Sequence, residues 1–211
     1  MKTVGIVGSN SMVGSRFCEL SKKFNLIKTD LRADIKVDIT DRDSVDKFIK
    51  LQKYDAIVLF SAFTDPEAAE KQKGNKDEIC WKINVQGVEH FKQLLDASST
   101  KFILISTNFV FDGQNGPYSE DDNPGEIEKL SWYGLTKMES EKIANSMQNS
   151  TIIRIATPYR AKFENKLDFA RQMLTRYEEG TMYPMFDDQM ITPTFIDDIA
   201  PALELIIEKD L

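Results

Sequence analysis

A tyrosine and a lysine stand four residues apart in the stretch SWYGLTKMESEK, at Tyr133 and Lys137. If this stretch is helical, both side chains lie on one helix face and can reach a common ligand. A tyrosine titrates near pH ~10, so at neutral pH it can donate a proton, and a nearby ammonium stabilises the anion that remains. The pair is suited to protonating a carbonyl oxygen while hydride arrives at the carbon, which is the chemistry of carbonyl reduction.

Two hydroxyl groups stand at the end of a predicted strand. The segment FILISTNFVFDG places Ser106 and Thr107 directly after an apolar run. Ligands bind at the carboxyl ends of the strands in open α/β sheets, so hydroxyls at this point face the binding crevice. Ser106 and Thr107 are therefore candidates to hold the same carbonyl oxygen as Tyr133.

A glycine-containing turn follows the first apolar run, as GSNSMVG. Gly8 and Gly14 fit the outer positions of a G-x-x-G-x-x-G pattern, and Ser11 occupies the middle position. Such a turn presents the free N–H groups and the positive dipole end of a helix to a pyrophosphate. The pattern predicts a dinucleotide phosphate site. Ser11 weakens it, because a side chain there can crowd the cofactor, and a purely structural turn would look similar.

An acidic residue ends the second predicted strand, about 20 residues after the turn. A carboxylate at Asp30 accepts hydrogen bonds from the adenosine ribose hydroxyls and favours NAD. Arg32 can meet a 2′-phosphate and favours NADP, so both coenzymes stay open, with a lean to NAD. The alternative is that both residues form a solvated turn.

Apolar runs alternate with amphipathic stretches along the chain. The strands and helices that they predict must position the candidate site residues. The runs predicted to be strands are 3–8, 26–30, 56–60, 102–106 and 151–156, and the predicted helices are 12–23, 43–52, 76–97 and 135–148. Strands with helices between them imply parallel pairing, right-handed crossovers and helices on both faces. The predicted fold is α/β, a doubly wound parallel sheet. Residues 112–126 form a polar loop rich in Gly and Pro, typical of a binding loop.

Composition narrows the class of partner. The 34 Asp and Glu residues exceed the 27 Lys and Arg residues, for a net charge of -7, which argues against nucleic acid. The two cysteines, Cys18 and Cys80, indicate neither a disulfide framework nor a metal site. The N-terminal stretch resembles neither a signal peptide nor a membrane span. We expect a cytoplasmic protein with a small-molecule substrate, without nucleic-acid or membrane partners.

The chain resembles the extended short-chain dehydrogenase/reductase superfamily and, within it, the dTDP-4-dehydrorhamnose reductase family. The segments that carry the resemblance are 8–14, 37–40, 60–70, 82–87, 105–113, 133–137 and 187–200. It implies a single NAD(P)-binding Rossmann-type domain over residues 1–211, with a partial substrate-lobe segment at 158–192 within it. By analogy it also implies a homodimer.

The resemblance assigns roles to individual residues. The implied catalytic residues are Thr107, Tyr133 and Lys137, and Ser106 remains a catalytic candidate from its position at the strand end. The expected substrate-binding residues are Thr107, Asn108 and Tyr133. Lys137 is also expected to bond the nicotinamide ribose. The other residues implied to bind the cofactor are Gly8, Ser11, Met12, Val13, Gly14, Asp30, Arg32, Asp38, Ile39, Ser61, Ala62 and Phe63.

Some features depart from the family pattern. Ser11 replaces the middle glycine, Asn108 stands in place of an aspartate, and residues 154–160 lack an expected tryptophan. The sequence ends at Leu211, where the family continues, so a shortened C-terminal substrate lobe is expected.

The leading hypothesis is an NAD(P)H-dependent reductase of a 4-keto nucleotide sugar or a similar ketone. One alternative is a catalytically silent NAD(P)-binding regulatory subunit, since such proteins resemble this reductase and include a regulatory subunit of methionine adenosyltransferase. Another is a nucleotide-sugar epimerase or dehydratase. Retention of both Tyr133 and Lys137 favours the reductase.

Overall fold

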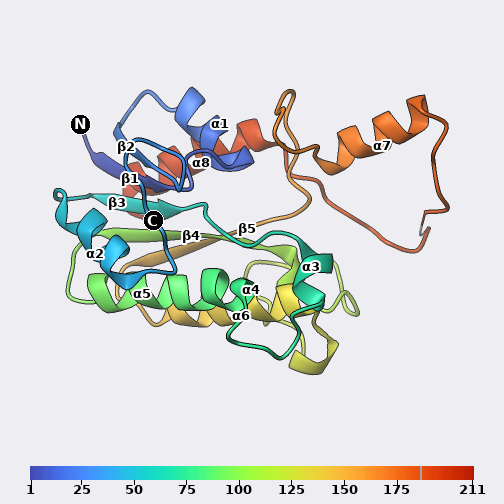
Figure 1. The fold of residues 1–211 in the computed structure, drawn as a ribbon, viewed down its shortest axis with the longest axis horizontal. Helices are drawn as coiled ribbons and strands as arrows, with labels where there is room; N and C mark the ends of the chain where they lie inside the picture. Colours follow the sequence, from blue (N-terminus) through green and yellow to red (C-terminus); the bar gives the residue numbers. More distant parts are fainter. Residues whose placement is uncertain (186) are drawn as a thin grey trace.

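A parallel β-sheet forms the centre of the computed structural model, which describes residues 1–185 and 187–211 (Figure 1). Its strands are β1 Thr3–Val7, β2 Asn25–Thr29, β3 Ala56–Leu59, β4 Lys101–Thr107 and β5 Ser150–Ile155. They pair in parallel in the order β2-β1-β3-β4-β5. The predicted doubly wound α/β fold is confirmed.

Helices cover both faces of this sheet (Figure 1). The α-helices are α1 Met12–Leu20, α2 Arg42–Lys50, α3 Pro66–Glu70, α4 Ile79–Trp81, α5 Gly87–Leu95, α6 Trp132–Asn145, α7 Phe169–Glu178 and α8 Ile196–Lys209. A π-helical turn, η1 Lys82–Gln86, joins α4 to α5, and two 3₁₀ turns are η2 Asn108–Val110 and η3 Ile127–Lys129. Helices α1 and α8 lie on one face, and α2, α5 and α6 lie on the other.

Strand β3 shows why the sheet is buried on both sides. Ala56 and Val58 pack in the cluster formed with α1 and α8, whereas Ile57 and Leu59 pack in the cluster formed with α2, α5 and α6. Alternate residues of a strand point to opposite faces, so a continuous apolar run suits a sheet with helices on both sides.

The order of the strands creates a crevice where the chain changes direction. The connection from β1 leads to β2 on one side, and the connection from β2 leads to β3 on the other. Ligands of open α/β sheets bind at such a switch point, outside the carboxyl ends of the strands. Here the turns after β1 and β3 meet, because the N–H groups of Phe60 and Ser61 both donate to the Val7 carbonyl oxygen, at 2.8 and 3.1 Å.

The predicted helices differ from the observed ones in their bounds, and two of the differences affect the candidate site. The stretch 76–97 is interrupted by η1, whose position depends on contacts with other parts of the fold. Helix α6 begins at Trp132, earlier than the predicted residue 135, because Ser131 caps it by accepting a hydrogen bond from the Gly134 N–H at 3.1 Å. Tyr133 therefore lies in the first turn of α6.

An excursion between Tyr159 and Phe195 contains α7, which projects from the body of the molecule (Figure 1). None of the residues of α7 is buried. The two ends of the excursion are joined, since the Tyr159 N–H donates to the Thr194 carbonyl oxygen at 3.0 Å and the Ile196 N–H donates to the Tyr159 carbonyl oxygen at 2.9 Å. In the part of the chain that the structure describes, no helix combines the length and apolar character needed to cross a membrane.

Candidate functional site

The turn after β1 is a tight cradle that needs both of its outer glycines. Gly8 has a φ of 89°, which favours glycine, and a Cβ there would lie 2.6 Å from the Ser61 backbone nitrogen. A Cβ on Gly14 would collide with the Gly8 carbonyl oxygen. The backbone of α1 therefore approaches β1 closely, as a phosphate-binding turn requires.

Ser11 has a structural role that the motif did not reveal. Its Oγ accepts a hydrogen bond from the Gly14 N–H at 3.1 Å, so it is the N-cap of α1. The first N–H groups of an α-helix have no acceptor within the helix, which leaves those of Met12 and Val13 for an anion. Replacing the middle glycine by Ser11 thus keeps the helix N-terminus capped.

Asp30 is joined to this turn. Its Oδ2 accepts from the Asn10 N–H at 3.2 Å and its Oδ1 accepts from the Arg32 N–H at 3.3 Å. The Gly8 and Ser9 N–H groups both donate to the Thr29 carbonyl oxygen at 2.9 Å. The end of β2 and the turn after β1 therefore form one unit, with Asp30 partly exposed at its edge.

Asp38 and Ile39 lie in the loop before α2 and differ in environment. Asp38 is exposed, and its Oδ1 accepts from the Thr40 N–H at 2.9 Å. Ile39 is 5% exposed and packs against Gly87, where an added Cβ would lie 2.9 Å from its Cδ1. Asp38 is accessible to a ligand, whereas the side chain of Ile39 is part of the core.

A buried amide connects the turn after β3 with α6. Ser61, Ala62 and Phe63 follow β3, and Asn84 in η1 binds both backbone groups of Phe63, with Nδ2 donating to its oxygen at 3.1 Å and Oδ1 accepting from its nitrogen at 2.8 Å. Asn84 Nδ2 also donates to Thr136 Oγ1 at 3.0 Å.

Asn84 was not among the predicted site residues. The segment KINVQG was the available signal, but the sequence does not show that this asparagine lies in a π-helical turn between two parts of the site.

Tyr133 is buried at the carboxyl end of β4. It is 8% exposed, and its ring meets Phe109 edge-on with centroids 5.5 Å apart. Gly134 allows this approach, because a Cβ there would collide with the Phe109 carbonyl oxygen. Burial raises the pKa of the Tyr133 phenol to about 12, although the neighbouring Thr107 side chain lowers it. The phenol therefore stays protonated at neutral pH.

Lys137 lies one turn further along α6 and is 3% exposed. Its Nζ donates to the Ile105 carbonyl oxygen of β4 at 2.8 Å, which fixes the amine beside the strand end. Burial lowers the pKa of the Lys137 ammonium to about 8, and Glu141 acts in the opposite direction. We expected the lysine to lower the pKa of the tyrosine, but in this structure burial dominates for both groups.

The two predicted hydroxyls of β4 occupy different environments. Thr107 Oγ1 accepts from the Phe109 N–H at 3.2 Å and donates to Asn108 Oδ1 at 3.3 Å. Ser106 is 3% exposed, and its Oγ has no hydrogen-bond partner. Successive strand residues point to opposite faces, and the pKa of Tyr133 responds to Thr107. Thr107 is therefore the hydroxyl beside the phenol.

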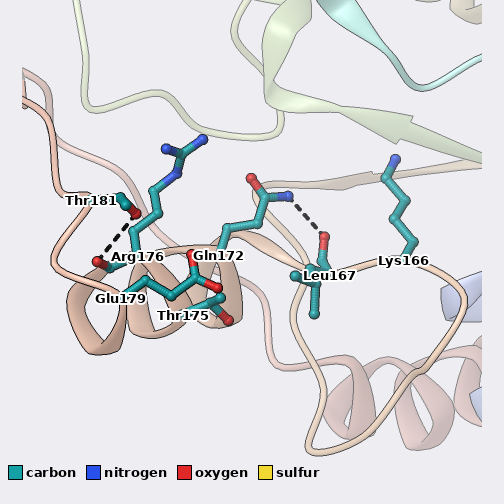
Figure 2. Close-up of a pocket in the computed structure, with 7 residues that line it drawn as sticks. All are labelled: Lys166, Leu167, Gln172, Thr175, Arg176, Glu179 and Thr181. Atoms are coloured by element: carbon teal, nitrogen blue, oxygen red, sulfur yellow. Dashed lines mark hydrogen bonds between the residues drawn. The ribbon is translucent and has the colours of Figure 1, made fainter.

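One described cavity lies along α7 and not at the strand ends. Its volume is about 470 Å³, and Figure 2 shows its lining residues, Lys166, Leu167, Gln172, Thr175, Arg176, Glu179 and Thr181. None of the predicted site residues is among them. The excursion nevertheless reaches the crevice, because Lys166 Nζ donates to Thr64 Oγ1 after β3 at 3.4 Å.

Known proteins share this sequence and architecture. Among curated relatives, dTDP-4-dehydrorhamnose reductase from Aggregatibacter actinomycetemcomitans is 26% identical over 208 residues, which cover 97% of this chain and 67% of that protein. Methionine adenosyltransferase 2 subunit beta from Danio rerio is 26% identical over 179 residues, which cover 84% of this chain and 53% of that protein. The chain thus spans about two thirds or less of the length of these relatives.

The fold is also similar to that of solved structures. A dTDP-4-dehydrorhamnose reductase from Clostridium acetobutylicum superimposes with a TM-score of 0.83 at 26% identity, over 99% of this chain and 71% of that chain. The family model described as the RmlD substrate binding domain matches residues 1–211. The resemblance expected from the sequence is confirmed, and the chain belongs to the RmlD substrate-binding domain family.

Proposed function

We propose that the protein is an NAD(P)H-dependent reductase of a 4-keto nucleotide sugar or a similar ketone. The observation that supports this most is the burial of Tyr133 and Lys137 on one face of α6 at the end of β4, with Thr107 beside the phenol. The similarity to reductases of dTDP-4-dehydrorhamnose supports the substrate class.

The crevice suits a dinucleotide. The turn after β1 has no room for a Cβ at Gly8 or Gly14, so its backbone is tightly folded. The N-terminus of α1 offers N–H groups to a pyrophosphate. The residues proposed to hold the cofactor are Gly8, Ser11, Met12, Val13, Gly14, Asp30, Arg32, Asp38, Ile39, Ser61, Ala62, Phe63 and Lys137. When bound, the nicotinamide supplies hydride.

The chain's own residues would handle the proton. A phenol with a pKa of about 12 remains a donor at neutral pH, so Tyr133 gives its proton to the ketone oxygen. The Lys137 ammonium stabilises the phenolate that results. Thr107 donates a hydrogen bond to the same oxygen, worth ~3 kcal/mol if it acts as one oxyanion-hole donor. Asn108, which is exposed next to Thr107, completes the proposed set, whereas Ser106 lies on the opposite face of β4 from Thr107.

Coenzyme preference is part of the proposal. The Asp30 carboxylate stands at the edge of the phosphate turn and would repel a 2′-phosphate, so we propose that NADH is preferred over NADPH. Arg32 is exposed two residues after Asp30 and can meet the 2′-phosphate of NADPH, which limits the preference for NADH.

The test is spectrophotometric. Purified protein with NADH or NADPH and dTDP-4-keto-6-deoxysugars should oxidise the reduced nicotinamide. Tyr133→Phe should lower kcat by at least ~100-fold, because the proton donor is lost, while the dissociation constant of the coenzyme stays unchanged. Unchanged kcat in Tyr133→Phe would contradict the mechanism.

The second candidate is a regulatory subunit that binds the dinucleotide without turnover. The similarity to methionine adenosyltransferase 2 subunit beta favours it. Tight coenzyme binding with no reduction of any ketone would support this reading. An epimerase or dehydratase would instead keep its coenzyme bound and form no net oxidised nicotinamide.

We also propose that the protein works in the cytoplasm as a homodimer. The two buried free thiols, Cys18 and Cys80, suit a reducing compartment. Native mass spectrometry would give the oligomeric state and identify a nucleotide that co-purifies.

A further inference from the structure

A buried ion pair joins α6 to the edge strand β5. Arg154 Nε donates to Glu141 Oε1 at 3.0 Å, and its Nη2 donates to Oε2 at 2.8 Å. The side chain of Glu141 is 3% exposed and that of Arg154 is 23% exposed. A buried carboxylate is costly unless it is paired, and this bidentate contact with Arg154 supplies the partner.

The pair lies next to the lysine of the candidate site. Glu141 follows Lys137 by four residues, so both side chains project from the same face of α6. The Lys137 Nζ donates to the Ile105 carbonyl oxygen of β4. The titratable groups near Lys137 on the elements packed around it are Tyr133 and Glu141 of α6, Cys80 of α4, Arg154 of β5 and, at the start of α6, Glu70 of α3.

Arg154 is itself fixed by Phe111 and by the polar loop 112–126 that follows it. Its guanidinium lies 5.0 Å from the centre of the Phe111 ring, and its Nη1 donates to the Glu120 carbonyl oxygen at 3.4 Å. Phe111 stacks on Tyr118 with centroids 4.2 Å apart. The orientation of the carboxylate beside Lys137 is therefore determined by an ordered set of contacts and not by a freely rotating side chain.

We propose that Glu141 is a positioning residue for the Lys137 ammonium: its carboxylate, held by Arg154, keeps a positive charge on the lysine next to the Tyr133 phenol. The catalytic meaning of this role rests on the proposed reductase function. A purely structural pair would only fasten α6 to β5, and its effect would appear in stability alone.

The first test measures the charge of the lysine directly, without turnover. The ¹³Cε signal of Lys137, identified by its loss in Lys137→Arg, is followed by NMR between about pH 6 and 11. The expected midpoint is about 8 in the wild type, and in Glu141→Gln it should fall by about one unit, because an opposite charge is removed. Glu139→Gln is the matched control, since this carboxylate on the same helix pairs with the exposed Lys142, and the midpoint should not move.

A second variant separates positioning from folding. Glu141→Gln leaves Arg154 without its partner and can unfold the protein, whereas Glu141→Gln with Arg154→Met removes both charges and should restore stability. The positioning role predicts that the Lys137 midpoint stays low in this double variant. A midpoint that returns to the wild-type value, or one that is unchanged in both variants, overturns the proposal.

The third readout is the pH profile of kcat. With a lysine midpoint lowered by one unit, Glu141→Gln should lose about tenfold in kcat at alkaline pH and little at about pH 6, with KM nearly unchanged. Glu141→Asp, which keeps the charge, should recover part of the loss, and a loss independent of pH would contradict the proposal. If the wild type reduces no ketone, the proposed function fails, while the NMR midpoint still decides the role of Glu141.

Discussion

At the scale of single residues, burial shifts the pKa values of two neighbouring side chains in opposite directions. It raises the pKa of Tyr133 to about 12 and lowers that of Lys137 to about 8. Both shifts favour the neutral form, because a low dielectric disfavours either charge. The spacing of the two residues was readable in the sequence. The sequence does not show that burial dominates both pKa values, because this burial depends on Phe109 and β4 packing over the start of α6.

Thr107 offers a residue-scale prediction. Thr107→Val removes the hydroxyl beside the phenol and should lower kcat about 100-fold, since one donor to the developing oxyanion is lost. Thr107→Ser keeps a hydroxyl and should retain most of the activity. Steady-state kinetics with the keto-sugar nucleotide measure both, and equal rates for the valine and serine variants would argue against a role for this hydroxyl.

At the scale of elements, the strands were predicted well and the helices less so. Each apolar run coincides with a strand because both sheet faces are covered, so burial leaves a continuous signal. The interruption of residues 76–97 by η1 left no such signal, since it is stabilised by the contacts of Asn84 with Phe63 and Thr136. A serine such as Ser131 is a typical N-cap, and it places the start of α6 before the predicted residue 135.

At the scale of elements, we predict that Asn84 stabilises the turn after β3. Asn84→Ala leaves both backbone groups of Phe63 unpaired and should lower the free energy of unfolding by roughly 2–4 kcal/mol, which urea titration measures. The dissociation constant of the coenzyme should also rise, because residues 61–63 lose their support. Asn145→Ala, at an exposed position of α6, is the control and should change neither quantity. A stable variant with normal coenzyme binding would show that the bridge is dispensable.

At the scale of the whole molecule, a cluster of charged side chains fastens the excursion to α1. Arg160 is 8% exposed, and its Nη2 donates to both Glu19 oxygens at 3.0 and 2.9 Å, while its Nη1 donates to Ser15 Oγ at 3.0 Å. Arg16 binds Asp197 of α8 through two hydrogen bonds of 2.7 and 2.6 Å. These partners are separated by well over a hundred residues, so sequence spacing gave no indication of them.

Arg160→Met should therefore destabilise the fold. Charged hydrogen bonds of this kind are worth roughly 1.5–3 kcal/mol, and the expected loss in the free energy of unfolding is of that order. Lys162→Met is a suitable comparison, because Lys162 pairs with Glu164 and both side chains are largely exposed. Equal unfolding midpoints in urea for the two variants would contradict the assignment.

The paired backbone of Tyr159 with Thr194 and Ile196 has an evolutionary consequence. Because the chain leaves and re-enters the body at one hydrogen-bonded junction, the stretch in between can be lengthened, shortened or exchanged for another without shifting the register of any strand. Under the proposed reductase function, with a partial substrate lobe at residues 158–192, substrate selectivity could thus diversify independently of Tyr133 and Lys137.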